Sequence, residues 1–356
     1  MRIYRNFTQV RNKNSRLPLA LAIGNFDGIH LGHQHVINLT KDIAASNNLN
    51  SAILTFEPHP AVFFNPQKAI DFRITTLAQK LKIFSNLQIS EAILLPFNQQ
   101  TQQISAADFV EEILYKALNV KHLIVGADFI FGKDRVGDIK LLQQKSQQFN
   151  FTLTEVSLLK SDVDIYQSYL KPEQIRSGVW GFPQGGADVA VREKQNIYSS
   201  TLIRKALWQG NLVSANKFLG RNFSINGVVK KGYGLAHEKL GFATANIAAK
   251  ANQIKVKFGV YKVLLTIEGE NKKLPAIMNF GIKPTLQQDL APLYEVHILD
   301  FNSDIYGKKV TIELLDFLRE EKKFSSLQQL KEQITADISS LSAADFVDEI
   351  SHQSTK

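Results

Sequence analysis

The chain has 356 residues, of which 44% are hydrophobic and 21% are charged, and its formal net charge is +9. Single hydrophobic cores stop growing near about 250 to 300 residues, so this length predicts two domains. The composition is ordinary for a globular protein and argues against intrinsic disorder. Because the sequence contains no cysteine, disulfides and thiolate metal sites are excluded.

The N-terminal stretch "MRIYRNFTQVRNKNSRL" is polar and lacks the apolar segment of a secretory signal. No apolar run reaches the roughly 18 residues of a membrane span, so we expect a cytoplasmic protein with no membrane partner. The positive charge fits nucleic acid, acidic lipid or nucleotide phosphate, and equally a solvated lysine-rich surface. Nucleic acid is the least favoured of these, because the basic residues are scattered rather than gathered in a stripe.

Strands and helices alternate in the first half of the chain. Hydrophobic patterning predicts strands over 19–24, 51–60, 92–97 and 122–132, and helices over 33–46 and 106–118. Strands separated by helices indicate a doubly wound, Rossmann-like α/β domain with a parallel sheet covered on both faces. Ligands of such sheets bind beyond the carboxyl ends of the strands, where the loop after Gly24 is expected.

Short alternating apolar runs, broken by Gly, Asn and Asp, fill the second half. The runs lie at 223–232, 259–269, 273–281, 293–301 and 308–319, and a helical pattern follows at 325–341. This pattern predicts a small antiparallel β-barrel with a C-terminal helix. We place the boundary at 211–221, after a helix predicted over 200–211, which gives domains 1–210 and 211–356.

Three histidines, His30, His33 and His35, stand within the stretch "GNFDGIHLGHQHVI". A zinc site of the H-E-x-x-H type needs histidines four residues apart, whereas His30 and His33 are three apart, so a metal is disfavoured. At a helix N-terminus, free N–H groups and the helix dipole favour an anion, and imidazoles there can donate hydrogen bonds to phosphoryl oxygens. The alternative is a pair of surface histidines that cap the helix. His35 is interpreted as structural.

The segment "GNFDGIHLGH" resembles the G-x-F-D-G-x-H-x-G-H signature of the nucleotidyltransferase superfamily. Further motifs make the chain similar to the bifunctional riboflavin kinase/FAD synthetases of bacteria. They are, in order, "TFEPHP" at 55–60, "VGADFIFGKDRVGD" at 125–138, "SSTLIRKAL" at 199–207, "LGFATANI" at 240–247, "MNFGIKPT" at 278–285, "YEVHILDF" at 294–301, "DIYGKKV" at 304–310 and "FLREEKKFSSLQQLKEQI" at 317–334. The series spans nearly the whole chain.

The resemblance implies two activities in one chain. The C-terminal half would phosphorylate riboflavin with ATP and Mg²⁺ to give FMN. The N-terminal half would transfer AMP from ATP to FMN, giving FAD and pyrophosphate. The implied partners are therefore the small molecules riboflavin, FMN and ATP, with no nucleic acid; the sequence sets no oligomeric state.

In the adenylylation site implied by the resemblance, His30 and His33 would bind the nucleotide phosphates and stabilise charge at the α-phosphorus. Arg204 would contact the leaving pyrophosphate. No protein nucleophile is needed, because the FMN phosphate attacks directly. The residues assigned to cofactor binding are Gly24, Phe26, Asp27, Gly28, His59, Phe63, Phe64, Asp128, Phe131, Ser200 and Thr201. For the phenylalanines, burial in the core is the ordinary alternative.

In the implied kinase site, Thr244 and Asn246 would hold Mg²⁺ and the ATP phosphates, since a hydroxyl and an amide suit a hard cation. Glu295 matches the catalytic glutamate of the family, the candidate general base for the riboflavin hydroxyl. The alternative interpretation of Glu295 is an exposed strand residue with no catalytic role. Arg319 would contact the flavin, and the loop "NFGIKPT" would close on the substrates.

The chain also departs from the family pattern. Ala243 replaces a motif proline, and His237 and Glu238 stand where the family has a Gly-Arg pair. An acidic group there should weaken binding of the ATP phosphates unless a nearby lysine compensates, so the sequence supports adenylylation more strongly than kinase activity. Where the family has a short connection, residues 160–196 form an extra segment, which we expect to be a mobile surface insertion.

Three functions from different classes follow from the sequence. The bifunctional enzyme is favoured. A monofunctional FAD synthetase, whose second domain binds flavin as a weak or inactive kinase, is the alternative. A nucleic-acid-binding protein comes last, because no basic stripe with interleaved aromatic residues is visible.

Overall fold

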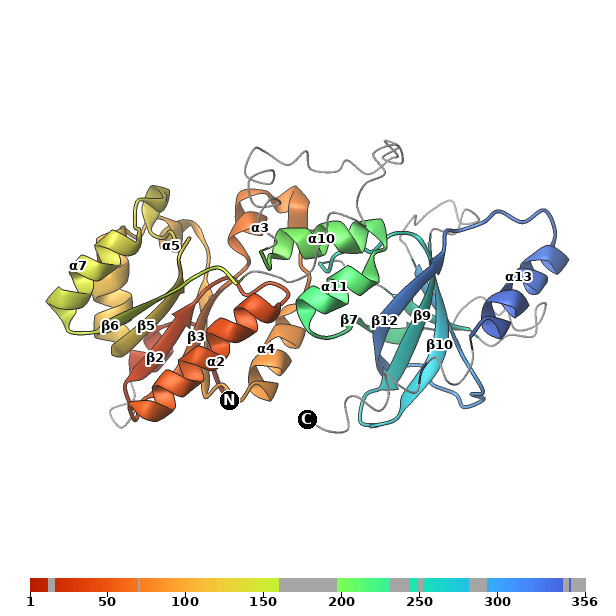
Figure 1. Cartoon of the computed structure of the whole chain (residues 1–356), viewed down its shortest axis with the longest axis horizontal. Coiled ribbons are helices and arrows are strands. Elements are labelled where there is room, and N and C mark those ends of the chain that lie inside the picture. The colour runs from red at the N-terminus through yellow and green to blue at the C-terminus, as the bar shows by residue number, and fades with distance from the viewer. Residues whose placement is uncertain are drawn as a thin grey trace. The chain divides into compact units, whose positions relative to one another are not determined.

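The structure is a computed structural model that describes residues 1–11, 17–69, 71–159, 197–230, 244–248, 252–281, 293–341 and 346. The chain divides into two compact units, Met1–Leu202 and Ile203–Lys356 (Figure 1). The predicted insertion at 160–196, and the motif residues His237, Glu238 and Ala243, lie outside the described residues.

Unit 1 contains a six-stranded parallel sheet with the order β1-β4-β3-β2-β5-β6. The strands are β1 (Arg2–Tyr4), β2 (Leu19–Ile23), β3 (Asn50–Glu57), β4 (Glu91–Pro96), β5 (Val120–Gly126) and β6 (Thr152–Val156). The predicted doubly wound sheet is confirmed. The strand expected over 122–132 ends earlier, at Gly126, where a turn closes through the hydrogen bond from Phe129 N to Gly126 O (3.0 Å).

The helices of unit 1 are mostly short. They are α1 (Thr8–Arg11), α2 (Leu31–Ser46), α3 (Pro60–Phe64), η1 (Pro66–Ala69), α4 (Leu77–Asn86), α5 (Gln99–Gln102), α6 (Ala106–Asp108), η2 (Phe109–Ala117), η3 (Lys133–Arg135) and α7 (Ile139–Phe149). The helix predicted over 106–118 forms as α6 followed by η2, a π-helix whose last bond runs from Leu118 N to Ile113 O. Each hydrogen bond of a π-helix spans five residues, one more than in an α-helix, so this segment is wider than an ordinary helix.

Strand β2 shows how the two faces of this sheet are packed. Leu19, Leu21 and Ile23 face a core that is completed by α1, η2 and α7. Ala20 and Ala22 face the opposite core, which is completed by α2 and α4 (Figure 1). Alternate residues of a strand point to opposite faces of the sheet. The large side chains of β2 therefore fill the core on one face, and the small alanines let α2 pack close to the sheet on the opposite face.

The strand order places the expected ligand crevice. From β2 the chain moves through β3 and β4 towards one edge of the sheet, and then returns to β5 and β6 on the other side of β2. Ligands of open α/β sheets bind where the strand order reverses, outside the carboxyl ends of the strands. The loops 24–30 and 127–137, which follow β2 and β5, flank that point.

Helix α10 (Ser200–Gln209) crosses from unit 1 into unit 2 and is followed by α11 (Leu212–Leu219). Unit 2 is a closed barrel with the order β10-β11-β8-β7-β12-β9 and only antiparallel pairs among its described strands. Its elements are β7 (Phe223–Lys230), β8 (Ala245–Ala248), β9 (Gly259–Ile267), β10 (Lys273–Gly281), β11 (Leu293–Ile298), β12 (Lys309–Arg319) and α13 (Leu327–Ser339). The predicted barrel with a C-terminal helix is confirmed.

Alternation along the strands fills the barrel. On β7, Phe223, Ile225 and Val229 are buried, and the residues between them are more exposed. Gly227 continues the buried set, and a Cβ atom there would lie 2.2 Å from Cγ2 of Ile247 on β8. Glycine is therefore required at this position by the close approach of a neighbouring side chain.

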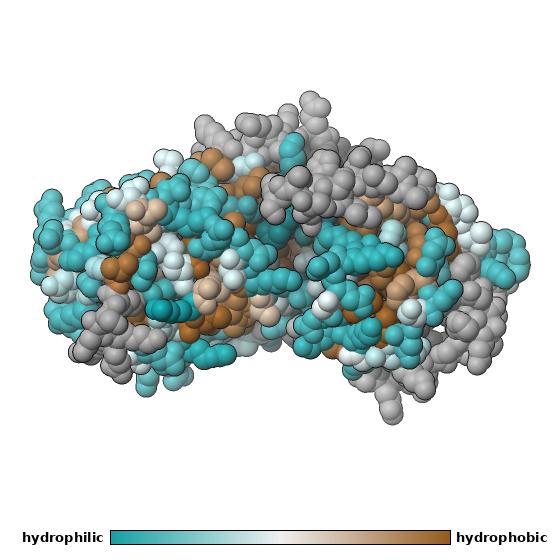
Figure 2. Space-filling model, turned by 90° about the horizontal axis from the view of Figure 1, so that it is seen from below, coloured by the Kyte–Doolittle hydropathy of each residue, from teal (hydrophilic) through white to brown (hydrophobic). Residues whose placement is uncertain are grey.

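The surface shown in Figure 2 is largely hydrophilic where it is described, with hydrophobic residues in separate patches. None of the helices in the described part of the chain has both the length and the apolar character needed to cross a membrane.

Candidate active sites

The loop 24–30, which we call the signature loop, has an unusual backbone. Phe26, Gly28 and Ile29 have left-handed φ angles of 47°, 82° and 42°. Left-handed φ angles strain residues other than glycine, so the surroundings must hold this loop in place. A Cβ atom on Gly24 would lie 3.1 Å from the ring of Phe26, which shows how tightly the loop folds on itself.

Asp27 anchors the middle of the signature loop. Its side chain is buried, and its Oδ1 atom accepts hydrogen bonds from the backbone N–H groups of Ile74 (3.0 Å) and Thr75 (3.2 Å). The N–H group of Gly28 donates to the hydroxyl of Thr75 at 3.2 Å. The predicted ligand residue Asp27 thus fixes the loop by bonds to the protein's own backbone.

A buried lysine, Lys80, holds the start of the signature loop through its backbone. Nζ of Lys80 donates to the carbonyl of Asn25 at 2.7 Å, and the hydroxyl of Thr55 donates to the same carbonyl at 3.1 Å. Burial lowers the pKa of Lys80 to about 8, and the nearby carboxylate of Asp27 opposes part of that shift.

His30 and His33 lie at the start of α2. His30 is the N-cap residue; its Nδ1 atom accepts a hydrogen bond from the N–H group of His33 at 3.3 Å, and the two rings stack with centroids 3.7 Å apart. Because Nδ1 accepts, the neutral ring of His30 carries its proton on Nε2, which is therefore a donor. Phe26 packs edge-on against His33, with centroids 5.2 Å apart. A Cβ atom on Gly32 would lie 3.2 Å from the His30 ring, so glycine there lets the ring stand close to the helix.

The start of α10 docks on the same loop. The hydroxyl of Ser199 caps this helix by accepting a backbone N–H, and the hydroxyl of Ser200 donates to the carbonyl of Asp27 at 2.8 Å. Thr201 is exposed at this helix start, and Arg204 follows one turn further along α10. The N-termini of α2 and α10 therefore both lie at the signature loop, an arrangement that favours an anion.

His59 and the aromatic residues near it belong to the start and end of α3. Nδ1 of His59 caps α3 by accepting a backbone N–H at 3.1 Å, and its ring packs on Phe72 with centroids 5.0 Å apart. Phe63 and Phe64 both contact Phe97, and Phe64 is 67% exposed. These rings offer an apolar surface at the carboxyl ends of β3 and β4.

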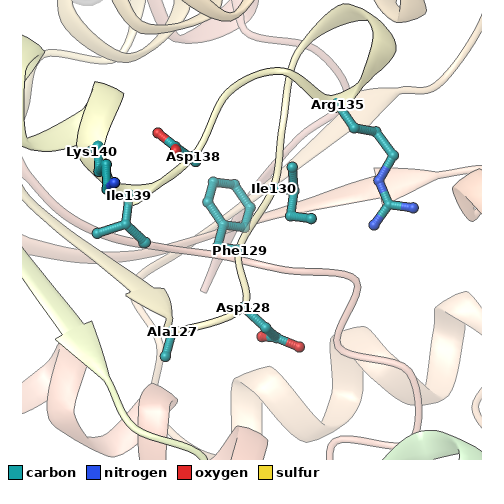
Figure 3. A pocket seen from close by; sticks show the side chains of 8 residues that line it. All are labelled: Ala127, Asp128, Phe129, Ile130, Arg135, Asp138, Ile139 and Lys140. Atoms are coloured by element: carbon teal, nitrogen blue, oxygen red, sulfur yellow. The ribbon is translucent and has the colours of Figure 1, made fainter. Parts of the chain in front are cut away.

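A pocket of about 550 Å³ opens beyond the carboxyl end of β5. It is lined by Ala127, Asp128, Phe129, Ile130, Arg135, Asp138, Ile139 and Lys140. In Figure 3 the charged side chains lie around the apolar Phe129 and Ile130. Phe131 is buried and does not line the pocket, but it stacks on the lining residue Phe129, with ring centroids 5.4 Å apart.

In unit 2, a polar row crosses three strands of the barrel. Glu295 on β11 is the direct partner of Asn246 on β8 and of Asn279 on β10. Directly opposed residues of antiparallel strands share a face, so the three side chains lie on the same side of the sheet. Tyr294 and Val296 beside Glu295 are buried, which places the row on the outer face of the barrel. Thr244 stands two residues before Asn246.

Glu321 joins this row from the segment after β12. Its carboxylate is hydrogen-bonded by the side chain of Asn279, and it lies against Gly281, where it fills the space that a Cβ atom would need. Burial raises the pKa of Glu321, and the neighbouring carboxylate of Glu295 raises it further. Two carboxylates therefore share the outer face of the barrel.

Arg319, the predicted flavin contact, is tied to α13. Its Nε and Nη2 atoms bind the carboxylate of Asp337 at 3.0 and 2.6 Å, and Nη1 donates to the carbonyl of Glu320 at 3.0 Å. A bidentate pair of this kind fixes the orientation of the guanidinium group.

Sequence reasoning missed Lys80, Ser199 and Glu321. Lys80 had a detectable signal, because it stands at helical spacing between Leu77 and Phe84, on what is otherwise an apolar stripe. Ser199 and Glu321 lay inside quoted motifs; Ser199 caps its own helix by a local bond to Leu202 N, whereas the partners of Glu321, Asn279 and Gly281, come from a distant strand. Local patterns do not reveal such partners.

Comparison with known proteins decides the family. The FAD synthetase family model matches residues 12–169, and the riboflavin kinase family model matches residues 219–344. The bifunctional riboflavin kinase/FMN adenylyltransferase of Buchnera aphidicola (subspecies Schizaphis graminum) is 36% identical over 95% of this chain and 97% of its own length. This chain belongs to the bifunctional riboflavin kinase/FMN adenylyltransferase family. Members from Pseudomonas fluorescens (35% identical over 90% of this chain and 91% of the relative) and Escherichia coli K12 (33%, over 92% of each) are also similar.

A solved structure has the same fold over nearly the whole chain. A protein from Streptococcus pneumoniae, described as a macrolide-efflux protein, superposes with a TM-score of 0.76 at 26% identity and covers 95% of this chain and 97% of its own. Both family matches lie on one chain, which favours the bifunctional enzyme over the monofunctional alternative.

Proposed function

We propose that unit 1 transfers AMP from ATP to the phosphate of FMN, giving FAD and pyrophosphate, and that unit 2 phosphorylates riboflavin with ATP. The observation that carries the first assignment is the signature loop. There, the starts of two helices and two stacked histidines gather N–H donors at the carboxyl end of a parallel sheet. Such an arrangement suits phosphates that gain charge during a transfer.

In unit 1, the Nε2–H group of His30 and the ring of His33 are proposed to donate hydrogen bonds to the nucleotide phosphates. Arg204 is proposed to contact the leaving pyrophosphate. The pocket beyond β5 supports a role for Asp128 and Phe131 near a ring system, because it combines an apolar wall with a carboxylate that can accept from ring N–H groups.

In unit 2, Glu295 is proposed as the general base that takes the proton from the riboflavin hydroxyl. The support for this role is its place beside Asn246 on one face of the barrel. Thr244 and Asn246 are proposed to hold Mg²⁺ together with the ATP phosphates. A hydroxyl and an amide fit a cation that keeps several waters, and Mg²⁺, when bound, would reduce the negative charge of the phosphates. The cytoplasmic location stays a prediction.

The test is to incubate the pure protein with riboflavin, ATP and Mg²⁺, and in parallel with FMN, ATP and Mg²⁺, and to resolve the flavins chromatographically. We expect FAD from both mixtures. FAD from FMN alone, with riboflavin unchanged, would support the monofunctional alternative. If neither flavin reacts, both assignments are wrong.

A further inference from the structure

Lys80 is placed under the signature loop by its helix. Helix α4 begins with a capping box, in which Thr76 and Gln79 satisfy each other's backbone N–H groups. That fixed start directs Lys80 into the core, where it is 4% exposed. Burying an ammonium group is costly, so its retention here calls for a compensating role.

The charged groups around Lys80 are largely engaged with other partners. Arg73 and Glu57 form a bidentate pair, with N–O distances of 2.9 and 2.6 Å. The carboxylate of Asp27 is bonded to backbone N–H groups on the segment before α4. The hydrogen bond of the Lys80 ammonium goes instead to the carbonyl of Asn25, at 2.7 Å.

This carbonyl lies immediately before the strained part of the loop. Lys80 and Thr55 both donate to it, which uses both of its lone pairs. From there the chain passes through the left-handed residues Phe26, Gly28 and Ile29 and reaches His30, the cap of α2. A fixed starting point is what such a loop needs to present its histidines in one geometry.

We propose that Lys80 is a positioning residue of the adenylyl-transfer site, whose buried ammonium holds the Asn25 carbonyl and thereby sets the place of His30 and His33. The inference rests on the proposed assignment of FMN adenylylation to unit 1. It predicts that loss of the ammonium acts on the rate of transfer more than on the affinity for ATP, because the phosphate donors remain present but are misplaced.

The test compares Lys80→Met with Lys80→Arg, which keeps the charge, and with Lys82→Met, an exposed lysine of the same helix. In FMN adenylylation, Lys80→Met should lower kcat by roughly 10- to 100-fold with less than about 3-fold change in KM for ATP, the scale of a small misplacement of catalytic groups. Lys80→Arg should recover part of the loss, and Lys82→Met should be unchanged. Riboflavin phosphorylation by the same molecules is the internal reference for the amount of enzyme, and a nearly unchanged KM for ATP in adenylylation shows that unit 1 is folded.

A pH series separates positioning from simple packing. Asp27, Glu57 and Arg73 face Lys80, and its pKa in the folded protein is about 8. The ratio of wild-type to Lys80→Met kcat should therefore be largest below pH 8 and shrink above it, as the wild-type ammonium loses its proton and becomes a weaker donor. Equal kcat values for Lys80→Met and Lys82→Met, or a ratio that does not change with pH, would overturn the proposal.

If Lys80→Met does not fold, the pH profile of kcat for Lys80→Arg alone tests the proposal. Its kcat should stay level between pH 7 and 9, where that of the wild type declines, and parallel profiles would overturn the proposal. A wild-type protein that makes no FAD from FMN would instead contradict the proposed function.

Discussion

His33 combines two features that give its substitution a clear outcome. Its ring stacks on His30 and packs against Phe26, so its position is fixed before any substrate binds. Removing a preorganised donor typically lowers kcat by about 10²- to 10³-fold, and we expect His33→Ala to lower FMN adenylylation by roughly that factor. Steady-state assays of FAD formation from FMN measure this directly.

His35→Ala is the matched control, because His35 is exposed on the same helix. It should leave the rate within about 2-fold, since surface substitutions away from a site have small effects. Riboflavin phosphorylation should survive in both variants. A His33→Ala protein that forms FAD at the wild-type rate would remove His33 from the site.

Single residues were predictable from the sequence where a motif carried them. His30, His33, Asn246 and Glu295 were all named from their motifs, and the structure brings the members of each pair together. Lys80 could not be assigned a role in this way, because its partner Asn25 is 55 residues away and becomes a neighbour only after the sheet forms. A sequence pattern reports local periodicity and says little about such pairings.

The central strands of the parallel sheet were predictable from the sequence, whereas helices α4 and α7 and the short strand β8 were not predicted. Strands β2, β3 and β4 are largely buried, and their positions agree with the expected ranges to within three residues at each end. The edge strands β1 and β6 were missed; β1 has three residues, and β6 is exposed over part of its length. A short strand at a sheet edge lacks both the length and the apolar pattern on which the prediction depends.

The packing of β7 against β8 makes a prediction for the barrel. At Gly227 a methyl group would lie 2.2 Å from Cγ2 of Ile247, so Gly227→Ala must displace the Ile247 side chain or the strand that carries it. Overpacking of this kind costs about 1 to 3 kcal/mol of unfolding free energy. Residual riboflavin kinase activity after heating should fall at a lower temperature than in the wild type.

The neighbouring Val228 is 39% exposed and supplies the control. Val228→Ala should cost less than about 1 kcal/mol, the full range of strand propensity. FMN adenylylation by the same samples should keep its wild-type heat resistance if unit 1 unfolds independently. A Gly227→Ala protein as heat-resistant as the wild type would mean that β7 and β8 are further apart than described.

At the scale of the whole molecule, one chain carries a family match for each activity, at residues 12–169 and 219–344. The boundary between the two compact units, between Leu202 and Ile203, falls inside α10. The first turn of α10 bonds to the signature loop, and its Leu207 carbonyl accepts a hydrogen bond from Lys257 N in unit 2. Cutting the chain near the predicted domain boundary would therefore disturb this helix. Point substitutions are the cleaner way to separate the activities.

Two full-length variants should complement each other. His33→Ala should convert riboflavin to FMN and stop there, whereas Glu295→Gln should leave riboflavin unchanged and still convert FMN to FAD. Because FMN is a small molecule that can diffuse between proteins, a mixture of the two variants with riboflavin, ATP and Mg²⁺ should make FAD. Flavin chromatography over time should show FMN rising before FAD. Phosphorylation of riboflavin by Glu295→Gln at the wild-type rate would show that Glu295 is not the general base, and a mixture that accumulates FMN without FAD would show that the adenylylation site cannot accept FMN from solution.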